Sequence, residues 1–326
     1  MASDIVMALT VKEISPYSRN THSASSGLRK LVDTKAVKEK IQIHNGKAPF
    51  SIIIYNTGLF PTGSMGDTDR DTVVAEFVRR LKTERPDVVC LSEVWLEDEK
   101  AKIRKELIDL YPKDYYLQGP DEEDLELQDG GLLLLSKYPI ISSGFHIYRD
   151  CNGEDCAVNK GVLYARVKPP ESATPWNIFF THTQNDTSEF GRDESDLKAL
   201  YGQLTRLGEF IQSKTKDDGF TAPTLVVGDF NINAVKKDRY DQMFTNLGTP
   251  TAIDVWATKC PGEPGFTHKN GVRIDYILLR AGYSLIPFPR KIDVIKWTAG
   301  GKSISDHYGV QAWFDEGLAI TRETVP

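Results

Sequence analysis

Short apolar runs of strand length alternate with amphipathic helical segments through most of this chain, from about residue 50 to residue 314. The runs FSIIIYN (50–56) and DVVCLSEV (87–94) have the length and composition of buried strands. Between them, the segment 67–81 is predicted to be a helix, because its apolar residues recur on one helical face. Thr68 and Asp71 near its start have the spacing of a capping box. Such alternation predicts a layered α/β domain in which helices cover β-sheets.

The remaining elements follow the same pattern. A second amphipathic helix is predicted over 194–213, where leucine and isoleucine recur three and four residues apart. Further strands are predicted over 131–136, 161–167, 177–182, 224–230, 273–279 and 308–314. We find no internal repeat and no second compositional region, so a single catalytic domain is expected over residues 49–316.

The two ends of the chain lie outside this predicted domain, as an N-terminal extension (1–48) and a C-terminal tail (317–326). Residues 1–50 hold eight Lys or Arg against four acids, whereas the whole chain has a formal net charge of −6. A basic arm can contact anionic lipid or a protein partner. The preferred interpretation is a solvated lead-in segment, because chain termini are often loosely ordered.

Overall charge and hydropathy narrow the classes of function. An acidic chain lacks the positive field that usually attracts nucleic acid, although a local basic groove is compatible with it. No apolar run is long enough to span a bilayer, and the run 5–11 has no basic residue before it, unlike a secretory signal. We therefore expect a soluble protein; its compartment stays open, with a cytoplasmic or membrane-peripheral location favoured.

The chain has four cysteines, too few for a disulfide scaffold at this length. Cys90 lies in an apolar run and is predicted to be a buried thiol. Cys151 and Cys156 flank a short polar turn; they can pair in an oxidising compartment, and in the cytosol they would be ordinary thiols.

Polar residues with catalytic chemistry occur at or beside the ends of the apolar runs. Strand ends of layered α/β proteins gather on one rim, where loops build sites on a rigid scaffold. Each such residue alone is more often a solvated or structural group, but together they supply hard oxygen ligands for Mg²⁺ and imidazoles for proton transfer. The set comprises Asn56, Glu93, His182, Asp229, Asn231, Asp275, Asp306 and His307.

Six segments resemble, in the same order, the motif series of the endonuclease/exonuclease/phosphatase superfamily. They are LSEVW (91–95), DGGLLLLSKYPI (129–140), FTHTQ (180–184), GDFNIN (228–233), RIDYIL (273–278) and SDHYGV (305–310). The resemblance covers about residues 50–314. It implies a deoxyribonuclease-like α/β fold of four layers, with two packed β-sheets flanked by helices and the active site at the sheet rims.

Within that superfamily the chain is most similar to the neutral sphingomyelinases, which are phospholipases C. The DGG segment and the segment NKG (159–161) carry this similarity, and Asp155 lies five residues before Lys160, as in the Asp–Lys switch of that group. A chance Asp and Lys in a polar surface hairpin is the alternative interpretation. The segment before SDH is short and offers only Trp297 as an aromatic tip, which places membrane docking by that hairpin in doubt.

The resemblance implies a role for each site residue. Glu93, assisted by Asn56, is expected to hold Mg²⁺, with Asp306 as a further ligand and Mn²⁺ or Co²⁺ able to substitute. His307 is expected to act as general base with Asp275 as its orienting partner. His182 is expected to stabilise or protonate the departing oxygen, and Asp229 and Asn231 to orient water and hydrogen-bond the phosphate oxygens. Lys160, the switch partner of Asp155, is expected to add a positive charge near the phosphate or the lipid backbone.

The implied activity is Mg²⁺-dependent hydrolysis of sphingomyelin to ceramide and phosphocholine. A phospholipid is thus the expected partner, with peripheral membrane contact and without nucleic acid; the oligomeric state is left open. A nuclease of the same superfamily is the main alternative, and a sugar-phosphate or inositol-phosphate monoesterase is a further variant. A binding protein without activity is disfavoured, because no catalytic position holds a chemically incapable residue.

Overall fold

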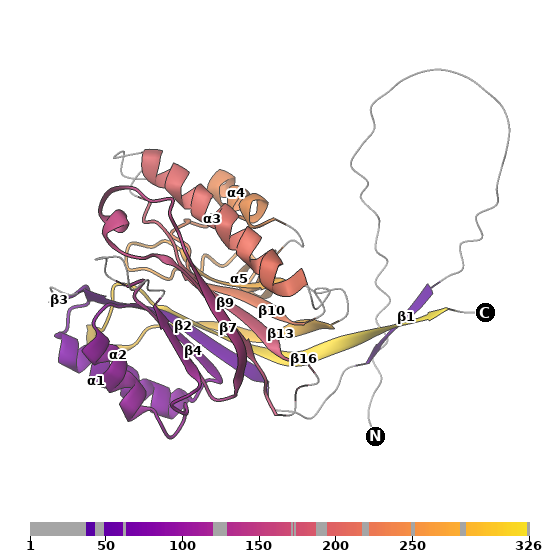
Figure 1. The fold of residues 1–326 in the computed structure, drawn as a ribbon, viewed down its shortest axis with the longest axis horizontal. Coiled ribbons are helices and arrows are strands. Elements are labelled where there is room, and N and C mark those ends of the chain that lie inside the picture. Colours follow the sequence, from indigo (N-terminus) through magenta and orange to yellow (C-terminus); the bar gives the residue numbers. More distant parts are fainter. Residues whose placement is uncertain are drawn as a thin grey trace, which may run out of the picture.

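The computed structural model describes residues 37–42, 49–60, 63–119, 129–170, 172, 174–186, 194–216, 222–248, 252–280 and 285–324. These residues form two large β-sheets that pack face to face, with helices on the outer faces (Figure 1). Among these residues, no helix has the length and apolarity needed to cross a bilayer.

The first sheet is built around a long C-terminal strand. Its strand order is β1-β16-β2-β4-β6-β5, with β13 also pairing with β16 and β3 with β2. Strands β2 and β4 run parallel, so their C-terminal ends meet at the same edge. The bounds are β1 (Val37–Gln42), β2 (Phe50–Phe60), β3 (Gly63–Ser64), β4 (Val88–Val94), β5 (Tyr116–Gly119), β6 (Leu132–Ser136), β13 (Leu285–Ile295) and β16 (Gly309–Thr324).

The second sheet has the strand order β11-β12-β10-β9-β8-β7. Its central strands β9 and β10 are parallel, which brings their C-terminal residues, His182 and Asp229, into register beside each other. The bounds are β7 (Ile140–Ile147), β8 (Gly161–Val167), β9 (Trp176–His182), β10 (Thr224–Asp229), β11 (Ala252–Asp254) and β12 (Asp275–Arg280). A separate hairpin consists of β14 (Thr298–Ala299) and β15 (Lys302–Ser303).

The helices complete four layers. Helices α1 (Arg70–Glu84) and α2 (Glu97–Glu106) lie on the first sheet, and α3 (Glu194–Thr215) and α4 (Lys237–Leu247) lie on the second (Figure 1). The short helix α5 (Val255–Lys259) follows β11, and the 3₁₀ helix η1 (Gly153–Ala157) lies between β7 and β8. The four-layered α/β sandwich expected from the sequence is therefore confirmed.

Three hydrophobic clusters separate these layers. One fills the space between the sheets, one lies between the first sheet and α1 with α2, and one lies between the second sheet and α3 with α4. Strand β2 contributes to two of these clusters. Ile52 and Ile54 face the other sheet, whereas Ile53 and Tyr55 face α1. Both faces of this strand are buried, which explains its continuous apolar run. Each fully buried large apolar side chain stabilises the fold by about 1.5–3 kcal/mol.

The first helix begins later than its sequence pattern predicts. The N-cap is Asp69, whose side chain accepts a hydrogen bond from the Thr72 backbone N–H, so the predicted capping box at Thr68 and Asp71 is wrong. The helix ends at Glu84, and the C-cap residue Arg85 adopts left-handed backbone (φ 48°) before Pro86. The Thr68 hydroxyl instead donates to the backbone carbonyl of Ser303.

The predicted states of two apolar side chains can be checked directly. Cys90 is a buried free thiol, as expected. Trp297 is only 3% exposed, and its ring stacks on Tyr55 with ring centroids 5.2 Å apart. The short hairpin therefore directs its one tryptophan into the core beside α1, where it is not available to contact a lipid surface.

Strand β1 and the C-terminal part of β16 form an antiparallel ribbon that projects from the body of the molecule (Figure 1). This ribbon joins part of the predicted N-terminal extension to part of the predicted C-terminal tail. The proposed boundaries at residues 48 and 316 stay predictions.

Candidate active site

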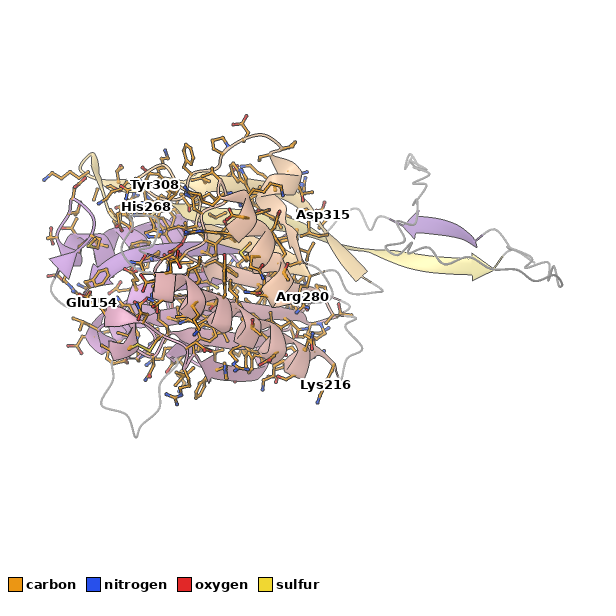
Figure 2. All side chains as sticks on the ribbon, turned by 90° about the horizontal axis from the view of Figure 1, so that it is seen from above. Glu154, Lys216, His268, Arg280, Tyr308 and Asp315 are labelled. Carbon is orange, nitrogen blue, oxygen red and sulfur yellow. A yellow bond between two sulfur atoms is a disulfide. The ribbon has the colours of Figure 1, made fainter. Side chains whose placement is uncertain are left out.

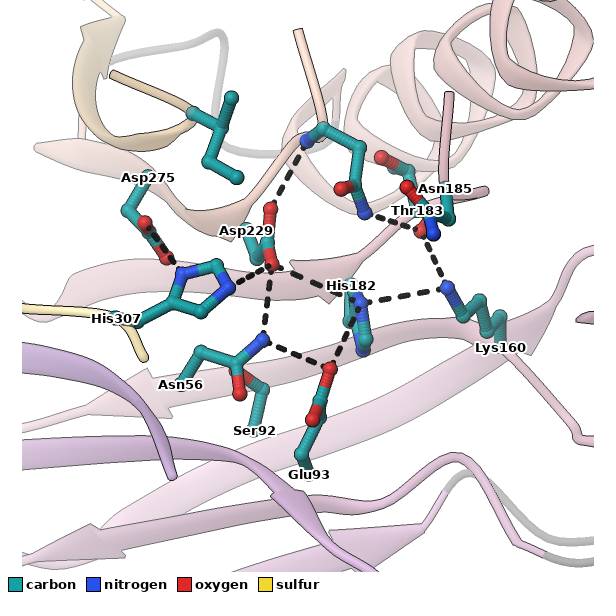
Figure 3. A network of polar contacts seen from close by, with 12 residues as sticks. Asn56, Ser92, Glu93, Lys160, His182, Thr183, Asn185, Asp229, Asp275 and His307 are labelled. Atoms are coloured by element: carbon teal, nitrogen blue, oxygen red, sulfur yellow. Dashed lines mark hydrogen bonds and ion pairs between the residues drawn. The ribbon is translucent and has the colours of Figure 1, made fainter. Parts of the chain in front are cut away.

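The strand ends that carry the polar residues meet at one end of the sandwich. Figure 2 shows Glu154 and His268 at this end, whereas Lys216, Arg280 and Asp315 lie toward the opposite end. A cleft of about 440 Å³ opens there between loops of both sheets. Eight of the ten predicted site residues line it, namely Glu93, Asp155, Lys160, His182, Asp229, Asn231, Asp306 and His307. The other two, Asn56 and Asp275, stand behind this lining and hydrogen-bond to it (Figure 3).

His307 is held in a defined orientation by a buried carboxylate. Its Nδ1 lies 2.9 Å from Oδ2 of Asp275, the first residue of β12. The Ser305 hydroxyl donates to the Asn56 carbonyl and accepts from the His307 backbone N–H, which ties the SDH segment to β2. With Nδ1 occupied by Asp275, Nε2 is the ring nitrogen left for other chemistry; it lies 3.8 Å from Oδ2 of Asp229 (Figure 3).

The charges around His307 favour its protonated form in the metal-free protein. Burial lowers the pKa of His307, but the carboxylates of Asp275, Asp229 and Glu93 outweigh it and raise the pKa to about 10. Any change that neutralises one of these carboxylates therefore lowers the proton affinity of the imidazole.

Asp229 occupies the centre of the polar network. Its Oδ2 accepts from Nδ2 of Asn56 at 3.0 Å, and its Oδ1 accepts from the backbone N–H of Asn231, also at 3.0 Å. Burial, together with the nearby Asp275 carboxylate, raises the pKa of Asp229 to about 6. The preceding Gly228 has φ +133°, and a Cβ there would lie 1.9 Å from the Thr181 carbonyl oxygen. Only glycine allows β9 and β10 to approach this closely beside Asp229.

Glu93 sits near the end of β4 in a strained backbone conformation, with φ 58°. Burial raises the pKa of its carboxyl to about 7. Asn56 donates from Nδ2 to Oε1 of Glu93 at 2.9 Å, and the Asn56 amide oxygen accepts from the Gly58 backbone N–H. In this arrangement Asn56 orients Glu93 and Asp229 rather than presenting its own oxygen to the cleft. Strained positions of this kind persist where the surrounding structure over-determines them, commonly at functional sites.

These residues fit a hard divalent cation. Glu93 is a buried carboxylate that lines the cleft, and its raised pKa reflects a charge that burial leaves poorly compensated. Oxygen ligands of this type suit Mg²⁺. Asp306 lines the same cleft, and it belongs with His268 and His307 to one cluster of ligand-type atoms within 4.8 Å of one another.

The His268 side of that cluster does not favour metal coordination. Nδ1 of His268 accepts a hydrogen bond from the backbone N–H of Asn270 at 3.1 Å, so the ring proton lies on Nε2. Nε2 faces Oδ2 of Asp306 at 3.4 Å. Burial raises the pKa of Asp306, but this hydrogen bond and the nearby charge of His307 lower it below its usual range. His268 therefore holds the Asp306 carboxylate in its ionised form.

Lys160 and His182 form the opposite wall of the cleft. The Lys160 ammonium donates to the Thr183 carbonyl at 2.8 Å and to Nε2 of His182 at 3.3 Å (Figure 3). It also donates to Oδ2 of Asp155 at 2.8 Å. Burial, together with the positive charges of Lys160 and His307, holds the pKa of His182 well below its usual range. His182 is therefore neutral, with Nε2 as an acceptor, and Lys160 carries the positive charge on this side.

Three features of the rim were not predicted from the sequence. Trp95 lines the cleft, and its ring lies 6.5 Å from that of His182. His268 packs edge-on against His307 with ring centroids 4.7 Å apart. Trp95 is the last residue of the motif LSEVW, and His268 lies shortly before RIDYIL, so their closeness to these motifs was the available signal. The third feature is a disulfide between Cys151 and Cys156, one of the two states that the sequence left open.

Comparison with known proteins identifies the class. Residues 53–307, more than half of the chain, match the Endonuclease/Exonuclease/phosphatase family. The chain belongs to that family, whose members are phosphoester hydrolases, and the resemblance seen in its motifs is confirmed.

Individual relatives are more distant. The chain is 26% identical over 266 residues to sphingomyelinase C of Listeria ivanovii, covering 75% of this chain and 73% of that protein. It is 23% identical over 316 residues to sphingomyelinase C 2 of Leptospira interrogans, covering 88% of this chain but only 48% of that protein. A beta toxin variant from Staphylococcus aureus, solved with bound magnesium ions, has the same fold, with a TM-score of 0.58 at 18% identity over 81% of this chain and 99% of the toxin.

Proposed function

We propose that this protein is a Mg²⁺-dependent phosphodiesterase that hydrolyses sphingomyelin to ceramide and phosphocholine. The observation that carries this proposal is the oriented His307–Asp275 pair in one cleft with Glu93 and Lys160. The cleft thus combines a base, a carboxylate suited to a cation and a fixed positive charge, which phosphodiester hydrolysis needs together. The relatives named sphingomyelinase C support the choice of substrate.

His307 acts as the general base in this proposal. The base is the neutral form of His307, which is favoured once a bound cation offsets the Glu93 charge that helps to raise the pKa of His307. In that form Nδ1–H donates to Asp275, and Nε2 takes a proton from the attacking water. The water oxygen forms the new bond to phosphorus, the bond from phosphorus to the ceramide oxygen breaks, and that oxygen takes up a proton from solvent in the cleft to give ceramide. Asp275 then stabilises the imidazolium, because its carboxylate is buried and lies 2.9 Å from the ring.

Glu93 is the proposed metal ligand, with Asn56 holding its carboxylate and Asp306 as a further ligand on the same cleft. A bound Mg²⁺, or Mn²⁺ or Co²⁺ in its place, supplies a Lewis acid that neutralises phosphate charge. The metal ions bound by the beta toxin are consistent with this choice.

Lys160 and His182 serve the leaving-group side. A neutral His182 is poorly suited to protonate the departing oxygen, whereas the Lys160 ammonium lies 3.3 Å from its Nε2 and can stabilise developing negative charge. Asn231, whose Nδ2 donates to the Thr183 carbonyl, is held by Asp229 beside this wall. We assign Asp229 and Asn231 to positioning the phosphate oxygens and the water.

Metal binding is expected to depend on pH. Because the pKa of Glu93 is raised to about 7, a proton competes with Mg²⁺ at this carboxylate, and affinity should weaken as the pH falls through that value. A bound cation also offsets the negative charge of Glu93, which is one of the charges that raise the pKa of His307. Metal binding should therefore lower that pKa and release protons. Calorimetry in two buffers of different ionisation enthalpy, at about pH 6 and about pH 8, measures both effects. An affinity and a proton count that do not change between these conditions would contradict the assignment of Glu93.

The substrate is tested by one Mg²⁺-dependent assay that compares sphingomyelin, lysophosphatidylcholine and duplex DNA. We expect the fastest hydrolysis with sphingomyelin and loss of all turnover in EDTA. Cleavage of DNA alone would replace the proposed substrate with that of a nuclease while leaving the chemistry of the site intact. Activity that persists in EDTA would remove the metal from the mechanism.

A further inference from the structure

The Cys151–Cys156 disulfide closes a short loop at the edge of the cleft. The loop contains η1 and connects β7 to β8, and both cysteines are exposed. Within it, Glu154 and Asp155 line the cleft. The disulfide thus lies beside the substrate-facing surface rather than in a core.

The Asp155 carboxylate of this loop contacts the wall of the cleft that Lys160 and His182 form. Oδ2 of Asp155 accepts from the Lys160 ammonium at 2.8 Å and from the Asn185 backbone N–H at 2.7 Å. Lys160 is 4% exposed, and its other contacts are the Thr183 carbonyl and Nε2 of His182, which are both uncharged. Asp155 is therefore the anion within ion-pairing distance of this buried ammonium among the described residues.

Both ends of the loop are anchored to neighbouring elements, whereas η1 between them is mostly exposed. Asn152 donates from its backbone N–H to Oε1 of Gln184 and from Nδ2 to Oδ1 of Asp196. At the other end, Gly161 begins β8 and pairs with His182. In between, η1 has no buried residue and no side-chain cap. A 3₁₀ turn of this kind has little intrinsic stability, so the position of Asp155 depends on the covalent link together with its own contacts to Lys160 and Asn185.

We propose that the Cys151–Cys156 disulfide is a positioning element of the active site, which holds Asp155 against Lys160 and thereby fixes the ammonium that the reaction uses. This inference rests on the proposed function of Lys160. A dithiol reductant would donate two electrons to the exposed disulfide, giving two cysteine thiols and the oxidised dithiol. The freed loop would then let Asp155 leave Lys160, and turnover would fall.

The experiment compares the oxidised protein, the dithiol-treated protein and the Cys151→Ser/Cys156→Ser variant. We expect reduction to lower kcat on sphingomyelin vesicles about tenfold, since a small displacement of a catalytic charge has effects of this size. The Ser variant should show the same loss and no response to dithiol. The Cys260→Ser variant, which removes a free cysteine elsewhere, should keep the full response of the native protein.

Two further measurements separate positioning from general stability. Hydrogen exchange at the Asn185 amide reports its bond to Asp155 without reference to activity, and it should become at least about tenfold faster on reduction while the β8–β9 ladder stays protected. In the Asp155→Asn variant kcat should already be low and should not respond to dithiol. Unchanged Asn185 exchange and unchanged kcat, or a loss of protection throughout β8 and β9, would overturn the inference. If the oxidised protein does not hydrolyse sphingomyelin, the proposed function fails, and the Asn185 exchange still decides whether the disulfide positions Asp155.

Discussion

Replacement of His307 by alanine is expected to lower kcat by about 10²-fold or more, with little change in KM. The structure places Nδ1 of this imidazole 2.9 Å from a buried carboxylate, so Nε2 is the nitrogen that exchanges a proton with water. Alanine removes the base but not the groups that bind the phosphate, so the loss should appear in turnover. Steady-state kinetics at saturating Mg²⁺ measures the effect.

The matched control is His146→Ala. His146 lies on β7 and stacks on Phe210, away from the cleft, so its replacement removes an imidazole without touching the site. Its kcat should stay within about twofold of the native value. Near-native turnover in a folded His307→Ala protein would mean that another group activates the water.

Replacement of Glu93 by glutamine is expected to lower kcat/KM by about 10²-fold or more and to weaken Mg²⁺ binding. Glutamine keeps the shape of the side chain but removes the negative charge that attracts the cation. The same change removes a poorly compensated buried charge, so the metal-free protein should not lose thermal stability. Activity as a function of Mg²⁺ concentration, together with the melting temperature in EDTA, tests both statements.

An exposed glutamate provides the comparison for this change. Glu106 ends α2 and pairs with Lys82 on the surface, so Glu106→Gln should leave the Mg²⁺ dependence unaltered. A Glu93→Gln protein with native activity and native Mg²⁺ dependence would place the cation elsewhere in the cleft.

Much of the fold could be predicted because its central strands are buried on both faces. Continuous apolar runs such as those of β2, β4 and β10 indicate strands directly, and the leucine spacing of α3 predicts a helix that the structure shows over Glu194–Thr215. The polar residues at the ends of the strands further predicted that the site lies at one rim of the sheets.

The elements that escaped prediction have weak or mixed patterns. Strand β7 (IISSGFHI) is mostly half-buried or exposed at an edge, and β13 contains prolines, which an edge strand tolerates. Helix α2 is rich in charged residues and buries only Lys100 and Ile103, so its apolar periodicity is faint. Strand pairing with β8 and β16 places β7 and β13 in the sheets, and no strong local apolar pattern marks them.

The sequence predicted that these polar residues gather in one cleft, but it did not predict their local geometry. The sequence places Asn56 among possible metal ligands, whereas in the fold its amide nitrogen faces Glu93 and Asp229. The neutral state of His182 depends on burial and on Lys160, which lies 22 residues earlier in the chain. His268 reaches Asp306 across 38 residues, a contact that no local pattern encodes.

Because Asp229 faces several site residues at once, the effects of substitutions at these residues are expected to be coupled. One oxygen, Oδ2, accepts from Asn56 and lies 3.8 Å from the Nε2 atoms of both His182 and His307. Losses from substitutions at the two histidines should therefore not multiply, because each change alters the carboxylate that the other ring faces. A double-mutant cycle would measure a coupling free energy between these two histidines. The rate enhancement would then be a joint property of Asp229 and the two histidines that cannot be divided into a contribution from each residue.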